Sequence, residues 1–223
     1  FIPPVGNLRE AKNVFGLRHL SDAQAIDQSA KEAENIVIIG SGLVGLDAAY
    51  GLMETGKNVS IVEMADRILP VQLDKIAAKE YQKRFESAGA KFYLGRKAAE
   101  TKMDENGKIT TVILDNGEEL KSDLIIVAAG VRSATAGFET EEIIVDRGMK
   151  VDEFMQTGAK DVYAAGDVTG LSGIWPNAQK QGETAALNMM GGRVPYTDRF
   201  AAKNTINFFG LNSLCVGEIV PKE

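Results

Sequence analysis

Apolar residues in the first hundred positions follow two alternating patterns. Short continuous runs rich in β-branched residues, such as NIVIIG at 35–40, indicate strands buried on both faces of a parallel sheet. Longer stretches with apolar residues at helical spacing separate these runs. We expect strands at 35–40, 58–64 and 90–95 and helices at 21–33, 43–56 and 73–89, the first of them capped by Ser21 or Asp22. Strand and helix therefore alternate as in a doubly wound, Rossmann-like α/β fold.

The pattern changes after residue 100. Two Asn-Gly pairs, at 106–107 and 116–117, predict tight hairpin turns and a small antiparallel β-meander over 101–123. Apolar runs at 123–130 and 161–168 then predict two more buried strands. Residues 175–192 read as a helix, with Pro176 in its first turn and a glycine pair after its end.

A glycine pattern, G-x-G-x-x-G, stands between the first strand and the helix that follows it. Gly40 permits a tight turn, Gly42 lets the backbone approach a phosphate, and Gly45 lets helix and strand pack closely. The N–H groups at the helix start, at Leu43 and Val44, would then face the anion. S-adenosylmethionine enzymes and plain strand-helix turns show similar strings, so the glycines alone leave the ligand open.

An acidic residue at the end of the next strand favours a dinucleotide as the ligand of the glycine loop. Glu63 lies 23 residues after Gly40, close to the spacing of about 20 expected for the acid that binds the adenosine ribose. A carboxylate there would repel the 2′-phosphate of NADP(H), so NAD(H) is the preferred ligand. Arg67 could contact adenine or phosphate, or it could pair with Glu63 or Asp66 at the surface.

Composition and charge argue against several other classes of protein. The chain of 223 residues has a net charge of −6, which disfavours general nucleic-acid or anionic-membrane binding. No apolar run reaches the roughly 18 residues of a membrane helix. One cysteine and one histidine make a His/Cys zinc site improbable, whereas composition leaves a carboxylate-only Mg²⁺ site open; we assign no metal site. The single cysteine fits a reducing cytoplasm.

Four motifs resemble the pyridine nucleotide-disulfide oxidoreductases, flavoproteins that include NADH oxidases, ferredoxin reductases and nitrite-reductase-like enzymes. The stretch 35–74 resembles their NADH-binding segment, and DLIIVAAGVRSAT resembles the strand where the chain leaves that domain. DVYAAGDV and SGIWPNAQKQGETAALNMMGG resemble the second FAD motif and the helix after it. The resemblance implies an NAD domain inserted into a related FAD domain. We expect the end of a first FAD segment at 1–6, the NAD(P) domain at 7–133, the second FAD segment at 134–198 and the start of an interface domain at 199–223.

The resemblance also assigns roles to single residues. It places Gly166 and Asp167 near the ribityl-phosphate part of FAD, although an aspartate there could instead cap a turn. The helix start at Pro176, Asn177 and Ala178 would face the flavin pyrimidine, where its positive end would stabilise charge on reduction, or Trp175 and Pro176 could simply plug a core.

Two further positions would lie near the nicotinamide. Gly130 matches a position close to it, or is a plain strand-end glycine. Asp47 stands where many relatives have Glu near the flavin-nicotinamide contact. It is a possible catalytic residue or an acid that favours the helix dipole.

The family's earlier FAD-binding glycine motif and its redox cysteine have no counterpart before residue 36. Cys215 reads as a buried small hydrophobe, and His19 as a surface or packing residue. We therefore expect a fragment of an FAD-dependent NADH oxidoreductase. The fragment would bind NADH and turn over poorly, and its parent would be a homodimer. The electron acceptor would be a small molecule or a small redox protein.

Two other interpretations remain. One is a non-catalytic nucleotide-binding module, or a subunit completed by another chain. The other is a methyltransferase, which explains the first glycine motif but neither DVYAAGDV nor the hairpin signals.

Overall fold

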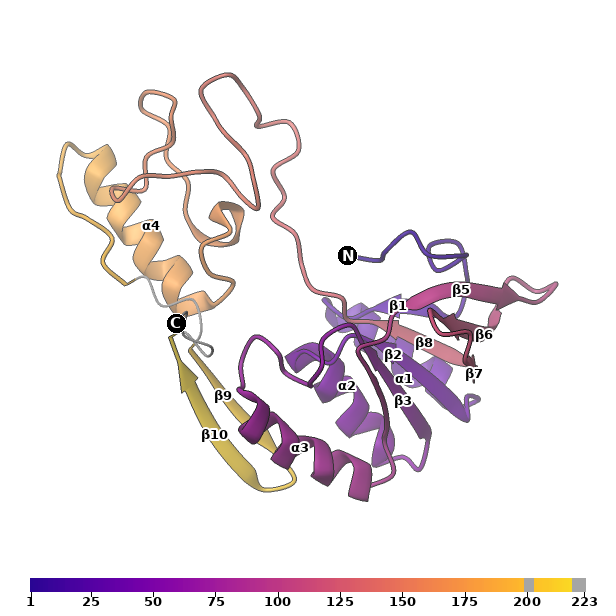
Figure 1. The fold of residues 1–223 in the computed structure, drawn as a ribbon. Coiled ribbons are helices and arrows are strands. Elements are labelled where there is room, and N and C mark those ends of the chain that lie inside the picture. The colour runs from indigo at the N-terminus through magenta and orange to yellow at the C-terminus, as the bar shows by residue number, and fades with distance from the viewer. Residues whose placement is uncertain (199–202, 218–223) are drawn as a thin grey trace. The chain divides into compact units, whose positions relative to one another are not determined.

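The computed structural model describes residues 1–198 and 203–217 and divides the chain into two compact units (Figure 1). Unit 1 contains Phe1–Gly130 and Ile206–Ser213, and unit 2 contains the described residues of Val131–Thr205 and Leu214–Glu223. We therefore place residues 1–6 and part of the expected interface segment with unit 1. Among the described residues, the longest apolar helices fall short of what is needed to cross a bilayer.

Unit 1 is built on a five-stranded parallel sheet in the order β1-β8-β2-β3-β4. The strands are β1 (Val14–Gly16), β2 (Asn35–Ile39), β3 (Asn58–Glu63), β4 (Lys91–Leu94) and β8 (Leu124–Val127). The predicted parallel α/β sheet is thus confirmed. The short strand β1 was not predicted, and it pairs with β8 at positions more than a hundred residues away, such as Val14 with Ile125.

Three helices cover one face of this sheet: α1 (Leu20–Ala30), α2 (Leu43–Met53) and α3 (Lys75–Ser87). Each helix connects one strand to the next: α1 joins β1 to β2, α2 joins β2 to β3, and α3 joins β3 to β4. All three connections cross the sheet in the same direction. Because such crossovers are right-handed, all three helices fall on the same side. Ile36, Ile38 and Ile61 point into this helical core.

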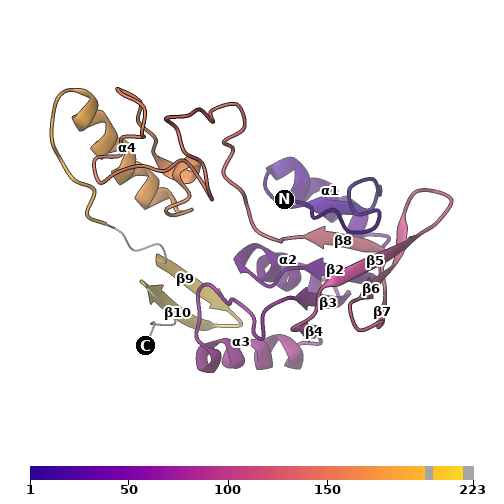
Figure 2. The same cartoon turned by 45° about the horizontal axis from the view of Figure 1, so that its top comes forward.

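The β-meander covers the opposite face. It consists of β5 (Ala98–Met103), β6 (Ile109–Leu114) and β7 (Glu119–Lys121), and the return from β4 to β8 runs through it (Figure 2). Its inward residues, such as Val112, meet Val37, Val62 and Ile125. Alternate residues of the central strands therefore serve two different cores, which is why these strands are apolar throughout. The hairpins predicted at both Asn-Gly pairs are confirmed.

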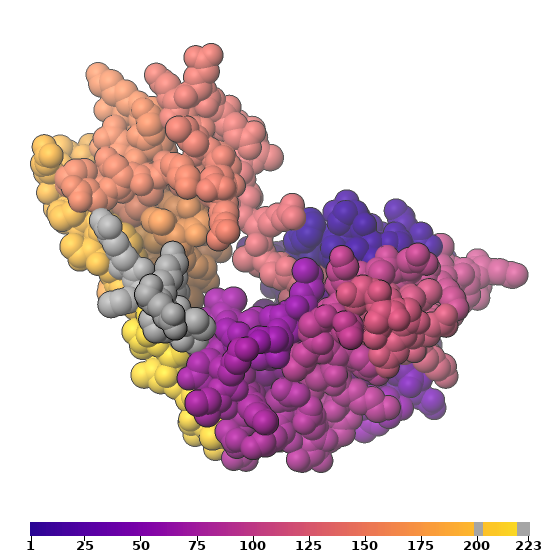
Figure 3. Space-filling model, viewed as in Figure 1, coloured from indigo at the N-terminus to yellow at the C-terminus, as the bar shows by residue number. Residues whose placement is uncertain are grey.

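A C-terminal hairpin consists of β9 (Lys203–Phe208) and β10 (Leu211–Val216). Its residues Ile206–Ser213 belong to unit 1 and lie alongside α3 in Figures 1 and 2, and Figure 3 shows yellow atoms against the purple atoms of that unit. Phe208 and Phe209 pack edge-on against Phe85 of α3 with ring centroids 5.1 and 5.0 Å apart. The Tyr81 hydroxyl hydrogen-bonds the hairpin backbone and Ser213. Cys215 is buried in β10, as its apolar surroundings predicted.

Unit 2 contains one α-helix among its described residues, α4 (Trp175–Met189), and a short 3₁₀ turn, η1 (Gly166–Thr169). The prediction of a strand at 161–168 was wrong. Only Tyr163 forms a bridge, to Gln156, and the described part of unit 2 supplies no adjacent strand to continue the ladder. A β-strand without a neighbour leaves its backbone groups unpaired, so the segment takes a turn instead.

The first helix also begins differently from the prediction. His19, not Ser21 or Asp22, is the N-cap of α1. Asp22 lies inside the first turn, where its carboxylate accepts hydrogen bonds from the N–H groups of Arg18 and His19. These bonds lower the pKa of Asp22, with the His19 N–H contributing most. His19 is exposed, in keeping with the predicted surface role.

Candidate dinucleotide site

The glycine loop lies at the carboxyl edge of the parallel sheet, where β2 ends between β3 and β8. The chain leaves β2 toward β3 on one side, whereas β8 and β1 lie on the other. Ligands of open α/β sheets bind outside the carboxyl ends of the strands, which is where this loop lies. The three motif glycines, Glu63, Arg67 and Asp47 all belong to elements that meet at or begin from this edge.

Two of the motif glycines are required by the packing of the loop itself. Gly40 has φ of +106°, and a Cβ there would lie 2.4 Å from the carbonyl oxygen of Ala128, just after β8. A Cβ on Gly45 would lie 2.0 Å from the carbonyl oxygen of Gly40. Neither position tolerates a side chain, so the loop and the start of α2 pack directly on the sheet.

Gly42 differs from the other two motif glycines because a Cβ there would meet no atom of residues 1–198 and 203–217 within 4 Å. It is the N-cap of α2 and has an ordinary extended conformation, with φ of −70°. The fold does not demand glycine at this position. Its missing side chain leaves open space in front of the helix N-terminus, which is the space that a phosphate group would need.

Backbone donors face no protein acceptor at this helix start. Among the described residues, the N–H groups of Gly42, Leu43 and Val44 form no hydrogen bond. The first N–H groups of a helix carry the positive end of its dipole, so they favour an anion. The donor set and the open space at Gly42 fit the pyrophosphate of a dinucleotide.

Glu63 is held beside this loop by three donors. Its Oε2 accepts hydrogen bonds from the N–H and the Oγ–H of Ser41, at 2.8 and 2.9 Å. Its Oε1 accepts one from the N–H of Ala65, at 2.8 Å. Sequence reasoning missed Ser41. A short polar side chain between the two glycines was the available signal.

Arg67 lies in the loop that follows β3 and binds that loop rather than Glu63. Its guanidinium donates to the carbonyl oxygens of Leu73 and Pro70, and it pairs with the Asp66 carboxylate at 3.1 Å. Asp66 also pairs with Lys75 at 2.6 Å, which contributes most to lowering the pKa of Asp66. Of the alternatives for Arg67, the structure shows the pairing with Asp66.

Asp47 lies in the second turn of α2, and the residue as a whole is exposed. Partial desolvation of its carboxylate raises its pKa. Among the described residues, that carboxylate forms no hydrogen bond or ion pair. Gly130 follows β8 with φ of +83° and open space at its Cβ position. Both residues remain predicted rather than tested contacts of the nicotinamide end.

The positions predicted to bind FAD lie in unit 2. The Gly166 N–H donates to Oε1 of Gln181 in α4 at 2.7 Å, and a Cβ on Gly166 would lie 3.4 Å from that of Ala178. The Asp167 carboxylate is exposed and has no partner among the described residues. Gln181 is fully buried, and its Nε2 has no hydrogen-bond acceptor in the part of the chain that the structure describes. A free carboxylate and an unsatisfied buried donor fit a polar cofactor near this turn, and sequence reasoning missed Gln181.

The start of α4 is only partly exposed. Asn177 is buried and donates to Ser172 Oγ at 3.1 Å. Trp175 is 83% exposed and Pro176 is exposed, so neither residue plugs a core within this chain. Among the described residues, no group of three or more His, Cys, Asp and Glu side chains is arranged to hold a metal ion.

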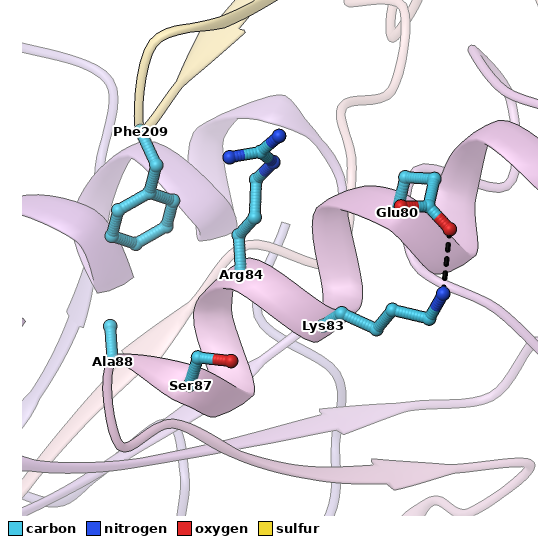
Figure 4. A pocket seen from close by; sticks show the side chains of 6 residues that line it. All are labelled: Glu80, Lys83, Arg84, Ser87, Ala88 and Phe209. Carbon is cyan, nitrogen blue, oxygen red and sulfur yellow. Dashed lines mark hydrogen bonds and ion pairs between the residues drawn. The ribbon is translucent and has the colours of Figure 1, made fainter.

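A shallow hollow at the end of α3 lies elsewhere (Figure 4). It is lined by Glu80, Lys83, Arg84, Ser87, Ala88 and Phe209, and Lys83 pairs with Glu80 within it at 2.7 Å. Because α3 runs antiparallel to the strands, its C-terminal end lies at the amino edge of the sheet. The hollow is therefore on the opposite side from the glycine loop.

The parallel sheet, the glycine loop with its unused N–H groups and the acid at the end of the next strand are typical of dinucleotide-binding α/β folds. Comparison with known proteins identifies the family. Residues 1–182 match the model of the pyridine nucleotide-disulphide oxidoreductases, and the chain belongs to that family of FAD- and NAD(P)H-dependent enzymes.

Relatives of several kinds share this segment. The epsilon subunit of NADH-dependent phenylglyoxylate dehydrogenase from Aromatoleum evansii is 33% identical over 97% of this chain and 53% of its own length. An NADH oxidase from Enterococcus faecalis is 32% identical over 74% of this chain and 37% of its own. A ferredoxin reductase structure from Rhodopseudomonas palustris has a TM-score of 0.80, with 25% identity over 88% of this chain and 51% of that one. The chain spans about half or less of the length of these relatives.

Proposed function

We propose that unit 1 binds NADH, with the pyrophosphate at the N-terminus of α2 and the adenosine ribose at Glu63. The observation that carries the proposal is the set of unused N–H groups at Gly42, Leu43 and Val44 beside the open space at Gly42. Anion binding by such a helix start is well founded in electrostatics. The close packing of Gly40 and Gly45 and the bonds to Glu63 support the proposal, because they hold the acid and the α2 N-terminus at the same edge of the sheet.

Selectivity for NADH over NADPH forms part of the proposal. The Glu63 carboxylate would repel a 2′-phosphate but would accept a hydrogen bond from a 2′-hydroxyl. The nearest cation along the loop, Arg67, donates to two backbone carbonyls and to Asp66, so its donors are largely used within the loop. A 2′-phosphate would have to displace these bonds before it could gain an arginine partner.

For the whole protein we propose an FAD-dependent NADH oxidoreductase of the cytoplasm. Bound FAD would supply the ring that accepts a hydride from NADH and passes electrons on. Asp167, Gly166 and the α4 start, with Pro176, Asn177 and Ala178, would hold part of that cofactor. The matched relatives bear the names of an oxidase, a ferredoxin reductase and a dehydrogenase subunit, so the shared segment does not determine the acceptor.

A second candidate is an electron-transfer subunit that works with another chain. Two relatives support it: the epsilon subunit named above, and an assimilatory nitrate reductase electron transfer subunit from Bacillus subtilis. The latter is 30% identical over 96% of this chain. In that case the acceptor is a protein partner rather than a small molecule.

Isothermal titration of the purified chain with NADH and NADPH tests the first proposal. We expect NADH to bind and NADPH to bind at least about tenfold more weakly, which corresponds to about 1.4 kcal/mol. Equal affinities would contradict the proposal that Glu63 selects NADH. The absence of binding heat with NADH would contradict the proposed NADH site. An absorbance scan near 450 nm tests the companion expectation, that this chain alone holds little FAD. A stoichiometric flavin band would contradict it.

A further inference from the structure

Ser41 is the most constrained polar residue of the glycine loop. It is fully buried, with 0% exposure, between two glycines. All three of its polar groups are used: the N–H and Oγ–H donate to Glu63, and the carbonyl oxygen accepts from the N–H of Leu69 at 3.0 Å. One residue thereby joins the glycine loop both to the end of β3 and to the loop that follows β3.

The contacts of Ser41 determine how Glu63 is presented. A glutamate has three rotatable side-chain bonds, and a free carboxylate at the surface would sample many positions. Ser41 places two donors on Oε2, whereas Oε1 receives a single donor from Ala65. A carboxylate oxygen accepts about two hydrogen bonds, so Oε1 is the atom with room for a ligand hydroxyl.

Ser41 also fixes the loop after Glu63. Leu69 is fully buried and has φ of +48°, a conformation that non-glycine residues rarely adopt. Its N–H is held by Ser41, and Arg67 closes the same loop through its bonds to Pro70 and Leu73. The acid and the loop beside it are therefore both positioned from inside the glycine motif.

We propose that Ser41 is a positioning residue for cofactor choice: its hydroxyl fixes the Glu63 carboxylate so that the site favours NADH over NADPH. The proposal rests on the NADH site proposed above. It adds that selectivity depends on the Ser41 hydroxyl and not on the charge of Glu63 alone. Ser41 itself does not touch the nucleotide.

The decisive experiment is a double-mutant cycle of Ser41→Ala and Glu63→Gln in the full 223-residue chain. We expect Ser41→Ala to weaken NADH binding about tenfold and NADPH binding less than about twofold. The loosened Glu63 carboxylate would weaken the charge-assisted hydrogen bond from the adenosine ribose 2′-hydroxyl of NADH, a group that NADPH lacks. In the Glu63→Gln background, Ser41→Ala should change the NADH:NADPH ratio less than about twofold. Additive effects on that ratio would overturn the proposal, since independent residues do not couple.

Ser122→Ala is the matched control. Ser122 is another buried serine of unit 1, and its hydroxyl hydrogen-bonds the carbonyl oxygen of Leu124 at 3.3 Å. The Ser122→Ala variant should lower the midpoint of thermal unfolding and leave the ratio of NADH to NADPH affinities unchanged. An equal change of that ratio in both variants would mean that loss of any buried hydroxyl suffices, and the proposal would fail.

Hydrogen exchange separates this proposal from the NADH site itself. If the wild-type chain binds no NADH, the proposed function fails, but the clamp can still be measured. The amides of residue 41 and Ala65 should then exchange faster in Ser41→Ala, because the Glu63 carboxylate that accepts from both is loosened. Unchanged protection would overturn the clamp. If Ser41→Ala does not fold, Ser41→Cys, with a similar volume and a weaker donor, takes its place under the same criteria.

Discussion

Gly42 and Gly45 offer a direct test of the proposed dinucleotide site, because the open space at Gly42 is proposed for the ligand whereas Gly45 is required by the packing of the fold. A Cβ on Gly42 meets nothing within 4 Å, whereas a Cβ on Gly45 lies 2.0 Å from the Gly40 carbonyl oxygen. In Gly42→Ala, a poorer N-cap is offset by a smaller loss of chain entropy, so stability should change by less than about 0.5 kcal/mol. The unfolding midpoint should then move by less than about 2 °C.

The same methyl group would occupy the space in front of the N–H groups of Gly42 and Leu43. A pyrophosphate forced outward by it would lose at least one charge-assisted hydrogen bond, worth about 1.5–3 kcal/mol. Titration calorimetry should therefore show NADH binding weakened roughly 10- to 150-fold in a chain of nearly wild-type stability. Wild-type affinity in Gly42→Ala would refute the placement of the pyrophosphate.

Gly45→Ala is the companion variant. Its Cβ cannot be accommodated unless the start of α2 moves away from the sheet, which costs about 1–3 kcal/mol or more. Thermal unfolding followed by circular dichroism should show a midpoint lowered by at least about 4 °C. If Gly45→Ala were as stable as Gly42→Ala, the packing argument for the loop would be wrong.

Two further predictions concern stability. Tyr81→Phe removes a hydroxyl that hydrogen-bonds the β9–β10 hairpin, so the free energy of unfolding should fall by about 1–2 kcal/mol. The midpoint of thermal unfolding should fall by roughly 3–6 °C, and an unchanged midpoint would mean that the hairpin does not pack on α3. Asp198 hydrogen-bonds Lys180 and Lys203, which lower its pKa from 3.8 to about 2. Its stabilising contribution is therefore present above about pH 4 and lost as the pH falls through about 2, so Asp198→Asn should lower the midpoint at pH 7 but not at pH 2, as measured by thermal scans.

Local requirements explain which elements were predictable. Asn106 and Asn116 each precede a glycine with φ near +80°, and those turns need only four adjacent residues to form. The glycine motif is visible for the same reason, because Gly40 must adopt a positive φ. The predicted boundaries of β2 and β3 agree with the structure to within one residue, because both strands are buried on both faces.

Long-range pairing explains what was missed. The strand β1 has only three residues, and it exists because Val14 pairs with Ile125 far along the chain. Residues 161–168 look like a strand from their apolar content, yet a strand also needs a neighbour, which the local sequence does not reveal. The role of Ser41 is hidden in the same way, since its partner Glu63 is 22 residues away and only the folded loop brings their oxygens within 2.9 Å.

The two candidate cofactor regions therefore differ in what they require from the rest of a protein. The glycine loop is fixed within unit 1: Gly40 lies against Ala128, and Ser41 holds both Glu63 and Leu69. Among the described residues, unit 2 leaves the Asp167 carboxylate and the Nε2 of Gln181 without partners. The segment just before Asp167 is paired only by the bridge between Tyr163 and Gln156. Dinucleotide affinity should consequently survive in this chain at close to full strength, whereas flavin affinity should depend on added structure. Titrations that found the reverse order, flavin bound and NADH not, would contradict this division.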